Sequence, residues 1–157
     1  MQGNPYKNRR RVGALAAATL ALAALALPAG ALARARSRTL DATANLTLDS
    51  RRGTTFKQSG PIRGSPFGSG TISVTIAFRR GVGYTSFRAS LPGGTVRGRG
   101  AVTLRVRRLT SYYSGSVAIT GSSGRYRGAS SGVIRVSGSG PVSAARSTIR
   151  LTGTVRY

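Results

Sequence analysis

The sequence predicts an all-β domain of seven or eight short strands, arranged as a sandwich or a closed barrel. Apolar and polar residues alternate along most of the chain, which is the pattern of strands with one buried face. Clusters of Gly, Ser and Pro separate the alternating runs, and no helical period extends beyond about one turn after the leader. Cysteine is absent, so the stability of the domain must come from one packed core.

Residues 1–33 have the features of a secretory signal peptide. Lys7 and three arginines precede a continuous apolar run, Val12–Leu27, which is shorter than the roughly 20 residues needed to cross a bilayer. A small-x-small pattern ends at Ala33, so we expect cleavage after Ala33 and a secreted, extracellular protein with no stable membrane span. A retained membrane anchor and export by the twin-arginine route remain alternatives.

A basic lead, residues 34–38, precedes the predicted β domain, residues 39–157. We expect this lead to be flexible, since it has no large apolar residue to pack into a core. The segment between residues 50 and 69 is expected to be a loop or a short extra strand around Phe56. The alternating runs lie, in chain order, at residues 40–48, 72–78, 87–91, 102–106, 117–119, 133–136 and 149–157.

Arginine accounts for nearly all of the strong positive charge, which is +23 for the whole chain. The arginines within the strands lie mostly opposite the apolar residues, and Asp41 and Asp49 are the only acidic residues. Because an unpaired buried guanidinium group costs several kcal/mol, we expect the arginines to face water.

The segment ITGSSGRYRGASSGVIRVSG, residues 119–138, interrupts the alternating pattern with glycines. Glycine accepts positive φ at little steric cost, so these positions predict a tight connection between two strands. Ser122 and Ser123 can cap the turn with their hydroxyl groups. Tyr126, the one large ring of the loop, is expected to cover the end of the core.

An alternative interpretation of the same loop is an anion nest. Backbone N–H groups of the glycine turns and two guanidinium groups would grip a phosphate or sulfate there. The residues of this candidate site are Ser122, Ser123, Gly124, Arg125 and Arg127.

Residues 119–136 resemble a glycine-rich segment that recurs in plant dirigent proteins and allene oxide cyclases, and still more closely small secreted bacterial proteins with the same barrel. Gly121, Gly124, Arg125, Tyr126, Gly128 and Ala129 carry the resemblance. It implies an antiparallel eight-stranded, calycin-like β-barrel with an interior cavity, often assembled as a homo-oligomer. The plant members steer a reactive intermediate within that cavity. No catalytic residue transfers to this chain, because glutamate is absent and both aspartates lie on a polar strand face.

Composition argues against conventional hydrolysis. Histidine, glutamate and cysteine are absent, so the usual acid–base groups and the ligands of zinc or iron sites are missing, and we expect no cofactor, metal site or catalytic residue. An enzyme of this type would be a cyclase or isomerase guided by the shape of a cavity.

The abundant arginine instead favours binding. We expect a non-catalytic binding or scaffold protein of the cell envelope or extracellular space, with affinity for anionic polymers but without specific recognition of nucleic acid. Two alternatives stay open: a charged surface that serves only solubility, and a barrel that binds or steers a small apolar ligand in its cavity.

Overall fold

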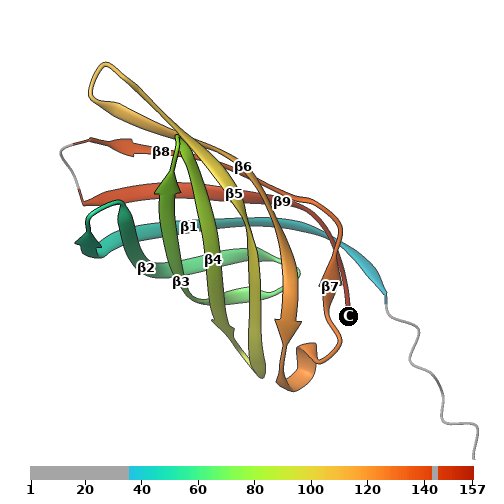
Figure 1. Cartoon of the computed structure of the whole chain (residues 1–157). Helices are drawn as coiled ribbons and strands as arrows, with labels where there is room; N and C mark the ends of the chain where they lie inside the picture. Colours follow the sequence, from blue (N-terminus) through green and yellow to red (C-terminus); the bar gives the residue numbers. More distant parts are fainter. Residues whose placement is uncertain (1–35, 143–144) are drawn as a thin grey trace, which may run out of the picture. The chain divides into compact units, whose positions relative to one another are not determined.

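The computed structural model describes residues 36–142 and 145–157, which form one closed antiparallel β-barrel (Figure 1). This confirms the predicted all-β class and the barrel. The predicted signal peptide, its cleavage position after Ala33, and the first two residues of the basic lead lie outside the described residues.

Eight strands make up the barrel, and each pairs with two antiparallel neighbours. The order is β1-β2-β3-β4-β5-β6-β8-β9, and pairing of β1 with β9 closes the cylinder. A 3₁₀ turn, η1 (Gly124–Tyr126), and a two-residue strand, β7 (Ser130–Ser131), lie in the connection between β6 and β8. The strands are β1 (Ser37–Arg52), β2 (Thr55–Ser65), β3 (Gly68–Arg79), β4 (Val82–Leu91), β5 (Gly94–Arg107), β6 (Thr110–Ser122), β8 (Ile134–Pro141) and β9 (Arg146–Arg156).

Strand β1 shows how the alternating pattern creates this fold. Leu40, Ala42, Ala44 and Leu46 are buried while the residues between them are exposed, as the two-residue period predicts. Pairing with β9 begins at Ser37, so the ladder starts inside the segment that we predicted as a flexible lead.

Strand β2 occupies the segment expected to be a loop or a short strand, and it is 11 residues long. Its inward positions include Gln58, Gly60 and Ile62, so a polar residue and a glycine replace two of the apolar residues that mark the other strands. Backbone pairing with β1 and β3 therefore identifies this strand, whereas its sequence lacks the regular apolar alternation that predicts a strand.

Glycines on inward positions allow bulky side chains to fill the narrow barrel. Phe87 of β4 lies opposite Gly98 of β5, and a Cβ atom at Gly98 would overlap the Phe87 ring. The missing side chain thus provides the space that the ring occupies. Large side chains on one strand thus lie opposite glycines on the next, and this arrangement fills the interior.

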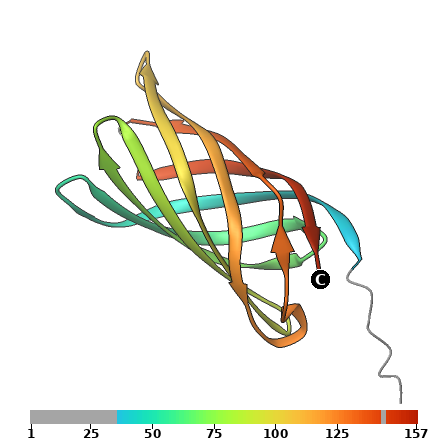
Figure 2. The ribbon, with the colours of Figure 1, turned by 45° about the vertical axis from the view of Figure 1, so that its right-hand side comes forward.

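Successive antiparallel strands turn at alternate ends of the barrel, so the connections form two groups, one at each end (Figure 2). We call one the hairpin end; it contains the β1–β2, β3–β4, β5–β6 and β8–β9 connections. We call the other the plug end; it contains the β2–β3 and β4–β5 turns, η1 and the C-terminus.

Candidate functional site

The interior of the barrel leaves almost no free space. Two internal cavities measure about 30 Å³ each and have apolar linings that include Ile72, Phe87 and Val117. A volume of this size corresponds to about one water molecule, whereas pockets for small ligands measure roughly 300–1,000 Å³. The described interior is therefore a packed core.

The plug end is sealed by three aromatic rings. Tyr126 is fully buried, and its ring centroid lies 5.3 Å from that of Phe67 and 5.5 Å from that of Tyr157. The Tyr126 hydroxyl donates a hydrogen bond of 3.1 Å to the carbonyl oxygen of Pro92. Edge-on aromatic contacts and a satisfied hydroxyl make this a stable closure, as the structural interpretation of the glycine-rich loop predicts.

The backbone of the candidate anion nest is engaged within the protein. The amides of Ser123 and Arg125 donate to the carbonyl oxygens of Thr95 and Gly93 across the β4–β5 turn, at 2.9 and 2.8 Å. The Arg127 amide donates to the carbonyl oxygen of Gly124 at 3.1 Å. These three amides are therefore not free to bind an anion, while the side chains of Arg125 and Arg127 are exposed.

The two predicted capping serines serve the same closure in different ways. The Ser122 hydroxyl accepts a hydrogen bond of 3.0 Å from the Ala129 amide and so ties the two ends of the loop together. The Ser123 hydroxyl accepts one of 3.2 Å from the amide of Thr95 on β5. The Arg125 guanidinium lies over the Tyr126 ring, 5.0 Å from its centroid. The two serine hydrogen bonds fasten the loop to β5 and β6.

Near the hairpin end the interior becomes polar but carries no ionised group. Gln58, Thr85, Ser111 and Ser147 are buried there, and the Ser147 hydroxyl has no hydrogen-bond partner among the described residues. Burial raises the pKa of the Tyr113 phenol, so this group stays protonated at neutral pH. A raised phenol pKa without a neighbouring base does not make an acid–base site.

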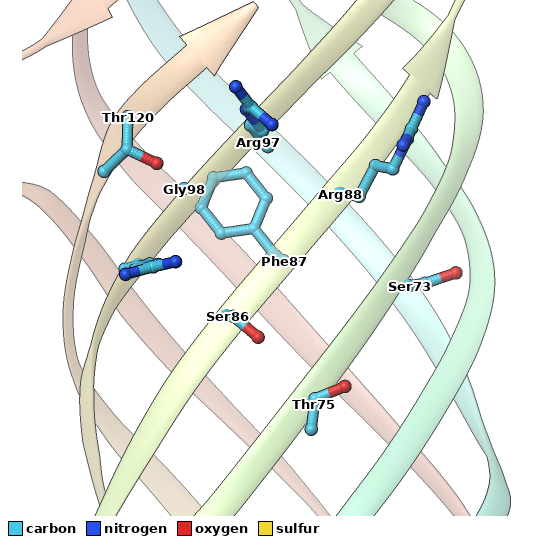
Figure 3. A pocket seen from close by; sticks show the side chains of 9 residues that line it. Ser73, Thr75, Ser86, Phe87, Arg88, Arg97, Gly98 and Thr120 are labelled. Atoms are coloured by element: carbon cyan, nitrogen blue, oxygen red, sulfur yellow. The ribbon is translucent and has the colours of Figure 1, made fainter.

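The outer wall carries a groove of about 590 Å³ across β3 to β6. Figure 3 shows the basic side chains of Arg88 and Arg97 on neighbouring strands, with hydroxyl side chains around them. We call this depression the arginine groove. Its lining residues are Ser73, Thr75, Ser86, Phe87, Arg88, Arg97, Gly98, Arg99 and Thr120.

Strand register places like charges against each other in the arginine groove. Arg88 of β4 is directly opposite Arg97 of β5, and Arg99 follows two residues later on the same face. Directly opposed residues on antiparallel strands have Cβ atoms about 5 Å apart, and like charges in such pairs are destabilising. The register therefore concentrates three positive charges on one part of the outer wall, where a bound anion would be favoured.

A local irregularity shapes one side of the groove. The register between β5 and β6 shifts between Arg97 and Gly98, leaving Thr120 as the extra residue on β6. The Arg97 guanidinium lies against Gly121, where a Cβ atom would collide with its Nε atom. The bulge and the glycine together let this long side chain lie across β6.

Neither acidic side chain of the protein neutralises the groove. Asp41 accepts two hydrogen bonds from Arg150, at 2.9 and 2.7 Å, in the one ion pair of the described residues. These hydrogen bonds hold the pKa of the Asp41 carboxyl below its ordinary value. Asp49 accepts a hydrogen bond of 2.8 Å from the Ser59 hydroxyl. The three groove arginines thus have no acidic counter-charge.

The sequence indicated that these arginines face outward but did not identify them as a cluster. The structure confirms the outward orientation, since every described arginine is exposed. One signal could have revealed the pairing: in the turn sequence LPGG, Leu91 pairs with Gly94, and counting outward from that turn places Arg88 opposite Arg97.

Fold and surface together define a class: a closed eight-stranded antiparallel barrel with a filled interior and an arginine-covered outer wall. The sequence matches no protein-family model and no curated protein. The described residues contain no cluster of three or more acidic, histidine or cysteine side chains that could hold a metal ion. Within the same residues, no helix has the length and apolar character needed to cross a membrane.

Proposed function

We propose that this protein is a secreted, non-catalytic binding protein that holds anionic polymers of the cell envelope or extracellular space on the outer wall of its barrel. The observation that carries the proposal is the opposition of Arg88 and Arg97, with Arg99 beside them and no carboxylate in the groove. A bound phosphate, sulfate or carboxylate would convert the repulsion between these groups into attraction.

The chemistry of the groove suits oxyanions. Guanidinium groups donate paired hydrogen bonds to the oxygens of phosphate and carboxylate groups, and the hydroxyls of Ser73, Thr75, Ser86 and Thr120 add neutral donors. The remaining arginines surround the barrel, so a long chain with repeated negative charges could continue beyond the groove. A polymer would thereby gain from releasing counterions along its length.

The filled interior argues for the outer wall over the alternative of a cavity ligand. Kinship with dirigent proteins and allene oxide cyclases remains a proposal, supported by the eight-stranded barrel and by the position of the glycine-rich loop at its closed end. Steering of a small apolar molecule would require an interior site, and the described cavities of about 30 Å³ are too small for one.

The test compares two triple variants by titration with soluble inorganic polyphosphate at rising salt. One variant changes the groove (Arg88→Gln, Arg97→Gln, Arg99→Gln), and the matched control removes three exposed arginines from other strands (Arg63→Gln, Arg135→Gln, Arg156→Gln). We expect the groove variant to lose at least about tenfold more affinity than the control. Its log–log salt dependence should fall by roughly 2–3 units, since each lost phosphate contact removes about 0.7–0.9.

Equal losses in the two variants would show that polymer binding uses diffuse charge without a groove. Binding that does not weaken with salt would contradict the electrostatic proposal altogether. Both variants should stay folded, and the groove variant should be no less stable than the unmodified protein, because a like-charge pair is removed. Denaturant unfolding checks this and separates lost binding from lost folding.

A further inference from the structure

Exposed apolar side chains gather at the hairpin end. Leu109, at the tip of the β5–β6 hairpin, is 79% exposed, and Val106 is 58% exposed. Six large apolar residues are exposed in the described chain, and one of them, Val133, lies at the plug end, directly before β8. The other five are Tyr84, Val106, Leu109, Tyr112 and Val142.

Arginine pairs gather at the same end. Among the described residues, adjacent arginines occur at 51–52, 79–80 and 107–108, with an equal spacing of 28 residues. Each pair lies at a turn of the hairpin end, at β1–β2, β3–β4 and β5–β6 respectively. Three successive hairpins therefore present the same doubled cation at one rim of the barrel.

Two of these turns permit a direct comparison. The β3–β4 and β5–β6 hairpins both have two-residue loops, Arg80-Gly81 and Arg108-Leu109, in which both residues have positive φ. Glycine is the favoured residue at the second position of such a loop, but Leu109 holds φ 64° there. A bulky side chain is strained in this conformation, so local folding preference does not explain this leucine.

The β5–β6 hairpin also projects beyond the β3–β4 hairpin (Figure 1), since the pairing of β4 with β5 ends at Val82 opposite Thr103. Residues 105–109 are exposed on both faces, which shows that no other strand covers this part of the hairpin. The Val142 amide donates a hydrogen bond of 2.8 Å to the carbonyl oxygen of Leu109, which holds Val142 beside the tip. The result is an apolar point next to Arg107 and Arg108.

We propose that the hairpin end docks on the surface of an anionic lipid bilayer, with Leu109 inserted among the lipid chains at the headgroup boundary. The arginines of the three turns would bind lipid phosphates, and Tyr112 would lie at the interface, where tyrosine is favoured. Peripheral membrane surfaces combine buried apolar side chains with cations in this way. A soluble polyanion would satisfy the arginines but offers no apolar phase for Leu109 and its neighbours.

A fluorescence experiment tests the orientation, because the chain contains no tryptophan. The full-length variants Leu109→Trp and Val133→Trp each place one indole at an exposed position, at the hairpin end and at the plug end respectively. Vesicles of phosphatidylcholine with one third phosphatidylglycerol are added to each. We expect the emission of Leu109→Trp to move to shorter wavelength and become protected from acrylamide, while that of Val133→Trp stays unchanged.

Several results would overturn the proposal. An unchanged Leu109→Trp spectrum, or an equal or larger shift for Val133→Trp, would exclude insertion through the hairpin end. A Leu109→Trp shift caused by soluble polyphosphate would assign the tip to a polymer, and a shift that grows with protein concentration in the absence of vesicles would assign it to a second copy of the chain.

A second arm separates this surface from the arginine groove. Arg107→Gln with Arg108→Gln should weaken binding to the anionic vesicles by about 30-fold, because each arginine near an anionic surface contributes about 1 kcal/mol. Arg97→Gln with Arg99→Gln removes the same charge from the groove and should change vesicle binding much less. Equal losses would reduce the effect to net charge and contradict docking by the hairpin end. Under the proposed function, polyphosphate binding should weaken more in the Arg97→Gln, Arg99→Gln variant than in the Arg107→Gln, Arg108→Gln variant. Each proposal can therefore fail while the other holds.

Discussion

The plug end and the hairpin end are built by the same eight strands, but they differ in how far their side chains are buried and hydrogen-bonded. At the plug end Tyr126 is fully buried, its hydroxyl is hydrogen-bonded, and the loop amides donate to backbone carbonyls. At the hairpin end Leu109 and Val106 remain in water, and the interior hydroxyl of Ser147 has no partner among the described residues. One end is thus optimised for folding, whereas the other retains features that folding alone would remove.

Backbone conformation shows the same contrast. The plug-end turns place glycine where φ is positive, with Gly93 at 84° and Gly124 at 62°. The hairpin end places Arg80, Arg108 and Leu109 in that region. Departures from local preference tend to mark functional sites, because the rest of the fold must compensate for them. We infer from this difference that the residues to test for function are the side chains held at positive φ, where the backbone conformation is unfavourable for them.

The largest expected effect comes from opening the plug. Tyr126→Ala would remove a fully buried ring that contacts Phe67 and Tyr157, and we expect a loss of roughly 3–5 kcal/mol in the free energy of unfolding. Urea unfolding measures this loss. The control Tyr112→Ala removes a half-exposed ring at the hairpin end and should change stability by less than about 1 kcal/mol.

Similar losses for the two tyrosine variants would break the comparison, because the hairpin end would then contribute to stability as much as the plug. A loss for Tyr126→Ala near that of an exposed residue would mean that the three-ring closure is not a part of the core.

The strands could be predicted from the sequence wherever the inward residues are apolar. In β1 the alternation of leucine and alanine with polar residues defines both the strand and its buried face. In β2 the inward positions hold Gln58, Gly60 and Ile62, so periodicity alone missed a full strand. Hydrogen bonding to two neighbouring strands keeps β2 extended despite its weak apolar pattern. The sequence of β2 alone does not reveal these neighbours.

The candidate sites were harder to predict because they depend on register. The glycine-rich loop has two interpretations: the amides of Ser123 and Arg125 serve the closure around Tyr126, and the anion nest stays a prediction. The arginine groove joins Ser73, Arg88, Arg97 and Thr120 from four strands, and a register change of one residue would turn each side chain to the other face. Sequence patterns showed that arginine faces outward, while only the paired strands show which arginines meet.

A smaller effect should come from giving the tip of the β5–β6 hairpin its preferred turn residues. Arg108→Asn with Leu109→Gly matches the favoured type I′ loop and should raise the free energy of unfolding by about 1–2 kcal/mol. Arg80→Asn is the matched control and should gain less, because Gly81 already occupies the second position of its turn. The same double variant should lose vesicle binding. A variant that loses stability would show that the tip packs against the barrel and would remove the contrast between the two ends.

The smallest expected effect concerns pH and the ion pair on the wall between the two ends. Arg150 lowers the pKa of the Asp41 carboxyl in the folded protein, so the unfolded state binds a proton more readily than the folded state. The contribution of Asp41 to stability is therefore complete above the ordinary carboxyl pKa and is lost as the pH falls through the lowered one. Because both groups are exposed, the slope should be shallow and should flatten further in high salt. Asp41→Asn should remove this acid-dependent slope from urea midpoints measured between neutral and acidic pH, because it lowers stability slightly near neutrality and leaves it unchanged below the lowered pKa. An unaltered slope in that variant would show that the Asp41–Arg150 pair does not act in solution, and the positive charge of the wall would then be unopposed there as well.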